Sequence, residues 1–153
     1  MAVISKSLTA AYLISLRNKL LFPVNAAGIK LCIGEMPTDA EIETLTQSSS
    51  RITDNVAVTI NTTGLTSKLK DTAWPPTYAS DTLPSNPKAL STKVGKIGWC
   101  VFYHTNPSVV VIGDVTLTNG TGLVSVDALD VVVGTPVTLT NIAIQVKRWN
   151  SEA

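Results

Sequence analysis

The sequence predicts a mainly β protein: an antiparallel β-sandwich of jelly-roll or immunoglobulin-like type, with one short N-terminal α-helix and a long Pro-rich loop. Short runs of β-branched residues, separated by Gly, Pro, Asn and Asp, are typical of such folds. A length of 153 residues fits one domain, and an apolar content of 44% is enough for a buried core. We expect a single domain over 1–153, with a helix and arm in 1–25 and the sandwich in 26–150.

The N-terminal region has the spacing of an amphipathic helix over about residues 7–21. Its apolar residues recur every four positions, at Leu8, Tyr12, Leu16 and Leu20. Pro23 ends the pattern. Arg17 and Lys19 interrupt the stretch where a signal peptide would be uncharged, so we expect no signal peptide and synthesis in the cytoplasm. Tyr12 and Leu16 are candidate contacts to a neighbouring molecule.

The β pattern begins at Gly28 and is clearest in the C-terminal third. Strands are predicted over 29–33, 56–60, 94–103, 109–117, 123–126, 131–133 and 137–146. Asn119-Gly120 is the strongest hairpin signal among the breaks between them. Pro136 fits only the first position of a strand or an edge strand.

A Pro-rich segment, about residues 64–93, interrupts this pattern as a loop insertion. It is much longer than the connections that compact domains normally use, which favours a functional or disordered segment. Its most distinctive part is Trp74, Pro75, Pro76 and, two residues on, Tyr78. Stiff backbone beside large aromatic side chains suits docking on a partner. The alternative is that Trp74 and Tyr78 fold back and cap the sandwich.

Few residues suit catalysis. Cys32 and Cys100 lie in apolar runs, as buried thiols do, although a disulfide between adjacent strands is the alternative. The single histidine, His104, could act as the base of a serine nucleophile, but the chain has no G-x-S-x-G motif to supply that serine. The carboxylates are scattered along the sequence. We therefore expect no catalytic residue, no cofactor site, no metal site and no small-molecule ligand, and a non-enzymatic role.

The charge content points to other proteins as partners. Twelve basic and eleven acidic side chains leave a net charge of +1, which offers no electrostatic footprint for nucleic acid. No apolar run reaches the roughly 18 residues of a membrane-spanning helix. Charged residues make up 15% of the chain, against about 25% in ordinary domains. Because sheet edges are normally guarded by charge, we expect neighbouring subunits to cover these edges.

The order of motifs resembles a group of small virion structural proteins of tailed bacteriophages. A helix and an apolar strand lead to Gly34-Glu35-Met36-Pro37, and the strand Gly98-Trp99-Cys100-Val101-Phe102 follows later. The stretch 110–115 comes next, and 134–144, which contains Val-Thr-Leu-Thr, closes the pattern. The resemblance covers most of the chain outside about 64–93.

What the resemblance implies is a β-sandwich building block of heads, collars or tails. The expected function is that of a non-enzymatic virion subunit (a decoration, collar or neck, or tail component) that binds copies of itself and other virion proteins. The alternative is a carbohydrate- or receptor-binding module of a virion fibre, in which Trp74, Trp99 or Trp149 stacks on a sugar ring.

Overall fold

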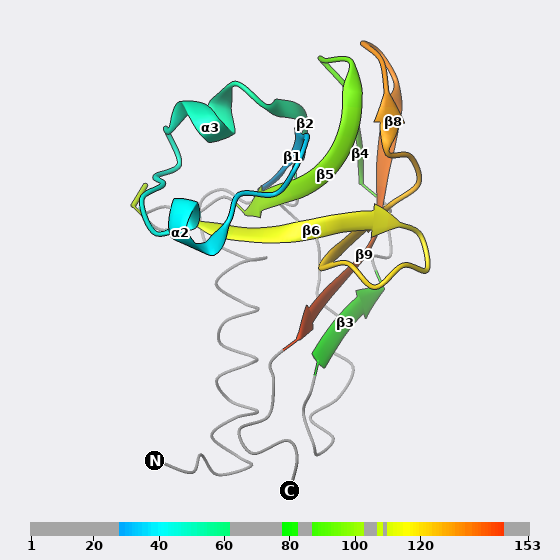
Figure 1. The fold of residues 1–153 in the computed structure, drawn as a ribbon. Coiled ribbons are helices and arrows are strands. Elements are labelled where there is room, and N and C mark those ends of the chain that lie inside the picture. Colours follow the sequence, from blue (N-terminus) through cyan, green and yellow to red (C-terminus); the bar gives the residue numbers. More distant parts are fainter. Residues whose placement is uncertain (1–27, 62–77, 83–86, 103–106, 109, 146–153) are drawn as a thin grey trace, which may run out of the picture.

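The computed structural model describes residues 28–61, 78–82, 87–102, 107–108 and 110–145 (Figure 1). The helix predicted over 7–21 and most of the Pro-rich segment lie outside these ranges. The described elements are β1 (Gly28–Ile33), α2 (Asp39–Ile42), α3 (Ser50–Thr53), β2 (Val56–Asn61), β3 (Tyr78–Thr82), β4 (Lys88–Leu90), β5 (Gly95–Phe102), β6 (Val111–Leu117), β7 (Val124–Val126), β8 (Asp130–Val131) and β9 (Pro136–Gln145). The predicted mainly β character is therefore confirmed.

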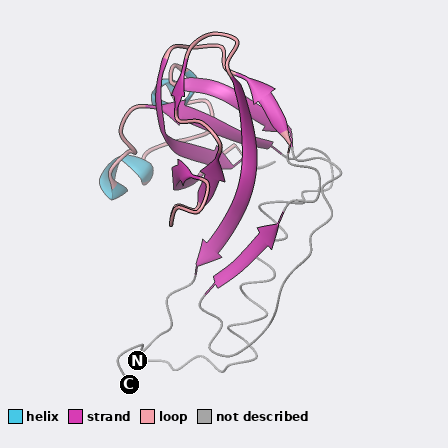
Figure 2. Ribbon diagram, turned by 90° about the vertical axis from the view of Figure 1, so that its right-hand side faces the viewer, coloured by secondary structure: helices cyan, strands magenta, loops and turns pink. Residues whose placement is uncertain are grey.

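The described strands form one sheet that curves until its ends nearly meet. Its order is β2-β1-β5-β6-β7-β9-β3, with β4 paired to β9 and β8 paired to β5. Thr92, just after β4, donates from its backbone N–H to the Ala57 carbonyl of β2 at 2.7 Å and from its hydroxyl to the same oxygen at 3.1 Å. Figure 2 shows the strands wrapped around a common interior, with the two helices at the periphery. The sandwich type predicted from the sequence stays a prediction.

The main core fills this interior. Most strands contribute aliphatic side chains to it, and its largest fully buried members include Ile29, Leu31, Ile60, Phe102, Leu139 and Ile142. In β1 and β7 the residues of this core alternate along the strand, at Ile29 and Leu31 and at Val124 and Val126, as a period of two predicts. The burial of this apolar surface is the main source of stability for a sheet of this kind.

A second, smaller core lies on the opposite face of β1 and β5. Cys32, Ile52, Trp99 and Val101 form it, and the segment between β1 and β2, which includes both short helices, contributes Ile52 and Leu45. Because β5 is covered on both faces, its last four residues are all buried. This explains why 99–102 reads as a continuous apolar run instead of an alternating one.

The glycines of the two motifs quoted above meet in the structure. The Gly34 N–H donates to the Lys96 carbonyl at 3.0 Å. A β-bulge shifts the β1–β5 register at this point, so that Cys32 pairs with Trp99 and Ile33 with Ile97. A Cβ on Gly98 would lie 2.2 Å from the Gly34 carbonyl oxygen, so only glycine fits at position 98.

Two predictions about the chain path are wrong. The Pro-rich segment is not loop throughout, because β3 and β4 lie within it and both pair with β9. Asn119-Gly120 does not close a hairpin, because β6 and β7 are parallel, with Val115 beside Val124.

The connection from β6 to β7 folds back over Thr116. The Gly122 N–H donates to the Thr116 hydroxyl at 3.1 Å, and Asn119 adopts a positive φ of 69°. A Cβ at Gly120 would lie 2.3 Å from that hydroxyl. The turn is therefore real, but it returns the chain to a parallel position, and a dipeptide signal cannot distinguish the two outcomes.

Candidate functional site

The most distinctive surface feature is a group of exposed aliphatic side chains at one end of the curved sheet. They are Leu90, Val94, Val132 and Val133, each between 58% and 68% exposed. Leu90 and Val94 flank the turn between β4 and β5, and the two other valines lie in the turn between β8 and β9. Both turns lie at the top of Figure 1. We call these four residues the apolar end.

Backbone hydrogen bonds join the two turns into one unit. Ser91 donates to the Thr135 carbonyl and accepts from the Gly134 N–H, both at 2.8 Å. The Thr135 hydroxyl accepts from the Val132 N–H at 3.0 Å, and Gly134 takes a φ of 91° that favours glycine. Because backbone pairing fixes both turns, the exposed valines are held in place before any partner binds.

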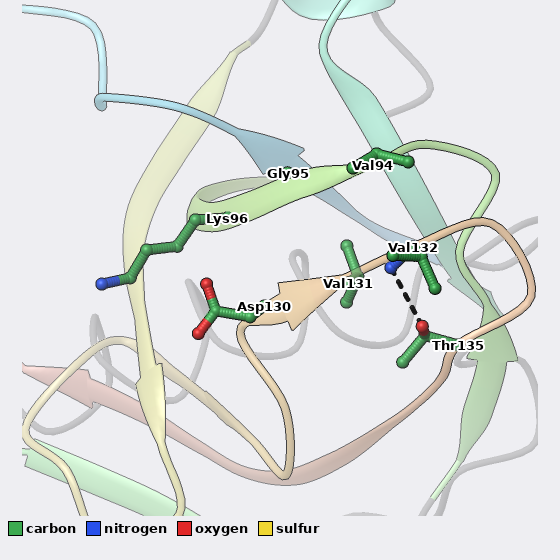
Figure 3. A pocket seen from close by; sticks show the side chains of 7 residues that line it. All are labelled: Val94, Gly95, Lys96, Asp130, Val131, Val132 and Thr135. Atoms are coloured by element: carbon green, nitrogen blue, oxygen red, sulfur yellow. Dashed lines mark hydrogen bonds between the residues drawn. The ribbon is translucent and has the colours of Figure 1, made fainter.

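A shallow hollow of about 460 Å³ lies between the turns (Figure 3). Val94, Val132 and Thr135 line one part of it, and Lys96 and Asp130 line another. Lys96 of β5 and Asp130 of β8 are direct cross-strand neighbours of each other. Figure 3 shows the Lys96 ammonium group lying apart from the Asp130 carboxylate. The hollow is therefore apolar with one cation and one anion at its side.

Among the described residues, neither Lys96 nor Asp130 has an ion-pair partner. The ion pair between Arg51 and Glu41, at 3.3 Å, belongs to the helical segment instead. Clustered aliphatic side chains on a fixed surface mark protein contact sites, whereas apolar residues scattered singly do not. The apolar end can therefore bind another protein by burying its aliphatic side chains, while Lys96 and Asp130 pair with opposite charges on that partner.

Both cysteines are buried and free, which confirms the buried-thiol alternative over a disulfide. Leu31 pairs with Cys100, and Cys32 pairs with Trp99. The two thiols therefore belong to different cores on opposite faces of the β1–β5 pair. Burial raises the pKa of the Cys32 thiol to about 12 and raises the pKa of Cys100 further, against an ordinary value near 9.

These raised pKa values predict that the protein becomes less stable at high pH. Above pH 9 the unfolded chain releases its thiol protons while the native protein keeps them, so the free energy of unfolding falls as the pH rises. Each thiol contributes a slope of up to about 1.4 kcal/mol per pH unit. Urea unfolding at several values between pH 8 and about 11 measures this slope. The Cys32→Ala/Cys100→Ala variant is expected to show a shallower decline, and parallel curves for the two proteins would contradict the prediction.

Five of the six interface residues predicted from the sequence lie outside the part of the chain that the structure describes. They are Trp74, Pro75, Pro76, Tyr12 and Leu16. Tyr78 begins β3, where its backbone pairs with Gln145. The choice between docking and capping for the Trp74–Tyr78 segment therefore stays open. His104 and Trp149 also lie outside the described ranges.

Trp99 is part of the second core, as its apolar strand predicted. Its side chain is 0% exposed, and its indole N–H donates to the Ile33 carbonyl at 3.3 Å. It therefore offers no open ring face for a sugar. Within the described ranges, no three His, Cys, Asp or Glu side chains gather as metal ligands would. None of the helices in this part of the chain is long and apolar enough to cross a bilayer.

The apolar end was not predicted from the sequence, although the sequence contains one signal for it. Val131, Val132 and Val133 are consecutive and fall in one predicted strand, although a period of two can bury only alternate side chains on one face. The strand ends at Val131, and the next two valines enter a turn that exposes them. A run of three valines directly before Gly134-Thr135-Pro136 was the available clue.

In comparisons with known proteins, no family model, no curated protein and no solved structure matches this chain.

Proposed function

We propose that this protein is a non-enzymatic structural subunit of a tailed bacteriophage virion, in which it acts by binding copies of itself and other virion proteins. The observation that carries the protein-binding part is the apolar end, with its four exposed aliphatic side chains on two hydrogen-bonded turns. The bacteriophage assignment rests on the ordered motifs of the sequence, from Gly34-Glu35-Met36-Pro37 to the closing 134–144 stretch.

The low charge of the chain supports the same proposal. With 15% charged residues and a net charge of +1, copies of the protein repel one another only weakly. Dense packing in a particle needs this property, because every subunit lies beside several others. The exposed valines would be a liability on a protein that acts alone, whereas in a particle they become buried.

An incorporation experiment tests the proposal. The chain is expressed with a tag in the phage-producing host, particles are purified, and the tagged protein in them is quantified against the major head protein. We expect incorporation of the native protein. For Trp74→Ala/Tyr78→Ala we expect a loss, with each anchor contributing about 2 kcal/mol or more.

Urea unfolding of the same variant separates the two alternatives for this segment. Unchanged incorporation together with a lower free energy of unfolding would assign Trp74 and Tyr78 to an internal cap. Absence of the native protein from every particle fraction would contradict the proposed function itself.

A further inference from the structure

The apolar end and its charge pair point to one specific occupant, a second copy of this chain. We propose that the apolar end is a two-fold symmetric interface in which Lys96 of each copy lies beside Asp130 of the partner subunit. This inference rests on the proposed function, because it names one of the contacts through which the subunit would assemble.

The charges beside the apolar end are balanced within one copy. Lys96 and Asp130 stand side by side across the β5–β8 pair, and both are exposed. A two-fold axis brings residue i of one copy against residue j of the other, and j against i. A surface that carries one cation beside one anion is therefore complementary to itself. A patch of a single sign would repel its own copy.

An apolar surface lies beside these charges. Val94 and Val132 line the hollow together with Lys96 and Asp130. Leu90 and Val133 extend the apolar surface along the same two turns. Apolar side chains at the centre and charged residues at the margin are the anatomy of protein–protein interfaces. In a two-fold dimer the same residues form both sides of the interface, because each copy contributes one set of them.

This surface is also formed before a partner binds. The hydrogen bonds between Ser91, Gly134 and Thr135 fix both turns. The Lys93 ammonium group donates to the Asp54 carbonyl, which attaches the β4–β5 turn to the end of α3. Association therefore orders few additional groups, which keeps its entropic cost small.

Sedimentation equilibrium of the purified full chain at low ionic strength tests the inference. We expect a reversible dimer whose population rises with protein concentration. Lys96→Glu places a Glu beside Asp130 of the partner subunit, and Asp130→Lys places two cations together, so each variant alone is expected to weaken dimerisation at least tenfold. A mixture of these two variants restores both ion pairs, and we expect the dimer to return.

Controls keep this result distinct from misfolding. Thermal unfolding monitors each variant, because like charges across β5 and β8 also act within one copy. Val132→Ser removes an exposed methyl surface without adding charge and is expected to weaken the dimer at all salt concentrations. The charge variants are expected to recover partly at high salt.

Other outcomes overturn the inference. A native chain that stays monomeric at millimolar concentration, or two charge variants that fail to associate when mixed, would show that something other than a second copy covers the apolar end. Incorporation of such a monomeric chain into particles would leave the proposed function intact, whereas its absence from particles would contradict that function independently.

Discussion

Replacing Gly98 with alanine is expected to destabilise the protein by about 3 kcal/mol or more, because the new methyl group overlaps backbone. A Cβ there lies 2.2 Å from the Gly34 carbonyl oxygen, and backbone cannot rotate aside as a flexible side chain can. The Gly34 N–H is held by the Lys96 carbonyl, and the β-bulge of β5 fixes the approach of the two strands.

The matched control is Gly28→Ala. Gly28 is also a strand glycine, but among the described residues a Cβ there would meet only the Ile60 carbonyl oxygen, at an ordinary 3.4 Å. We expect a change within about 1 kcal/mol, since alanine is the better strand residue where space allows. Urea unfolding of both variants measures the difference. Equal free energies of unfolding for the two would show that the strands separate without cost at Gly98.

Trp99→Ala is expected to have the second large effect, a loss of about 3–5 kcal/mol in the free energy of unfolding. The indole is completely buried between β5 and the helical segment, and its N–H is bonded to the Ile33 carbonyl. The Arg51 guanidinium lies 5.2 Å from the ring centroid and donates to the Glu35 carbonyl at 2.8 Å. Removing the ring therefore creates a cavity and removes the surface against which the Arg51 guanidinium packs.

Two further variants divide this effect. Trp99→Phe keeps most of the volume and loses the hydrogen bond, so we expect an intermediate loss. Arg51→Ala removes the cation–π contact and is expected to cost about 1 kcal/mol. Intrinsic fluorescence during urea unfolding gives the free energies for Arg51→Ala and the native protein, and far-UV circular dichroism gives them for the Trp99 variants. A loss below about 1 kcal/mol for Trp99→Ala would contradict the second core.

Local sequence patterns predicted the strands whose own residues show a β pattern or a strand-opening proline. β1 and β2 lie within one residue of their predicted bounds, and β9 begins at Pro136, where a strand-opening proline was expected. β3 and β4 were missed because their composition resembles the loop around them, and pairing with β9 determines that they are strands. α2 and α3 span four residues each, too few to show a helical period.

Long-range geometry was less accessible from the sequence. Asn119-Gly120 indicated a turn correctly, but the parallel pairing of β6 and β7 depends on how the turn packs on Thr116. The valine run indicated that some of its side chains are exposed, but which ones follows from the end of β8 at Val131. The close approach of Gly34 and Gly98, which are 64 positions apart in the sequence, likewise needs the paired strands.

The number of copies of this protein in purified bacteriophage particles tests the central claim most directly. Quantitative mass spectrometry against the major head protein gives that number. The proposed function predicts a fixed stoichiometry, with a dozen or so copies for a neck or collar and hundreds for a shell or tail tube. Complete absence from particles, with all of the protein in the free fraction, would contradict a structural role in the virion.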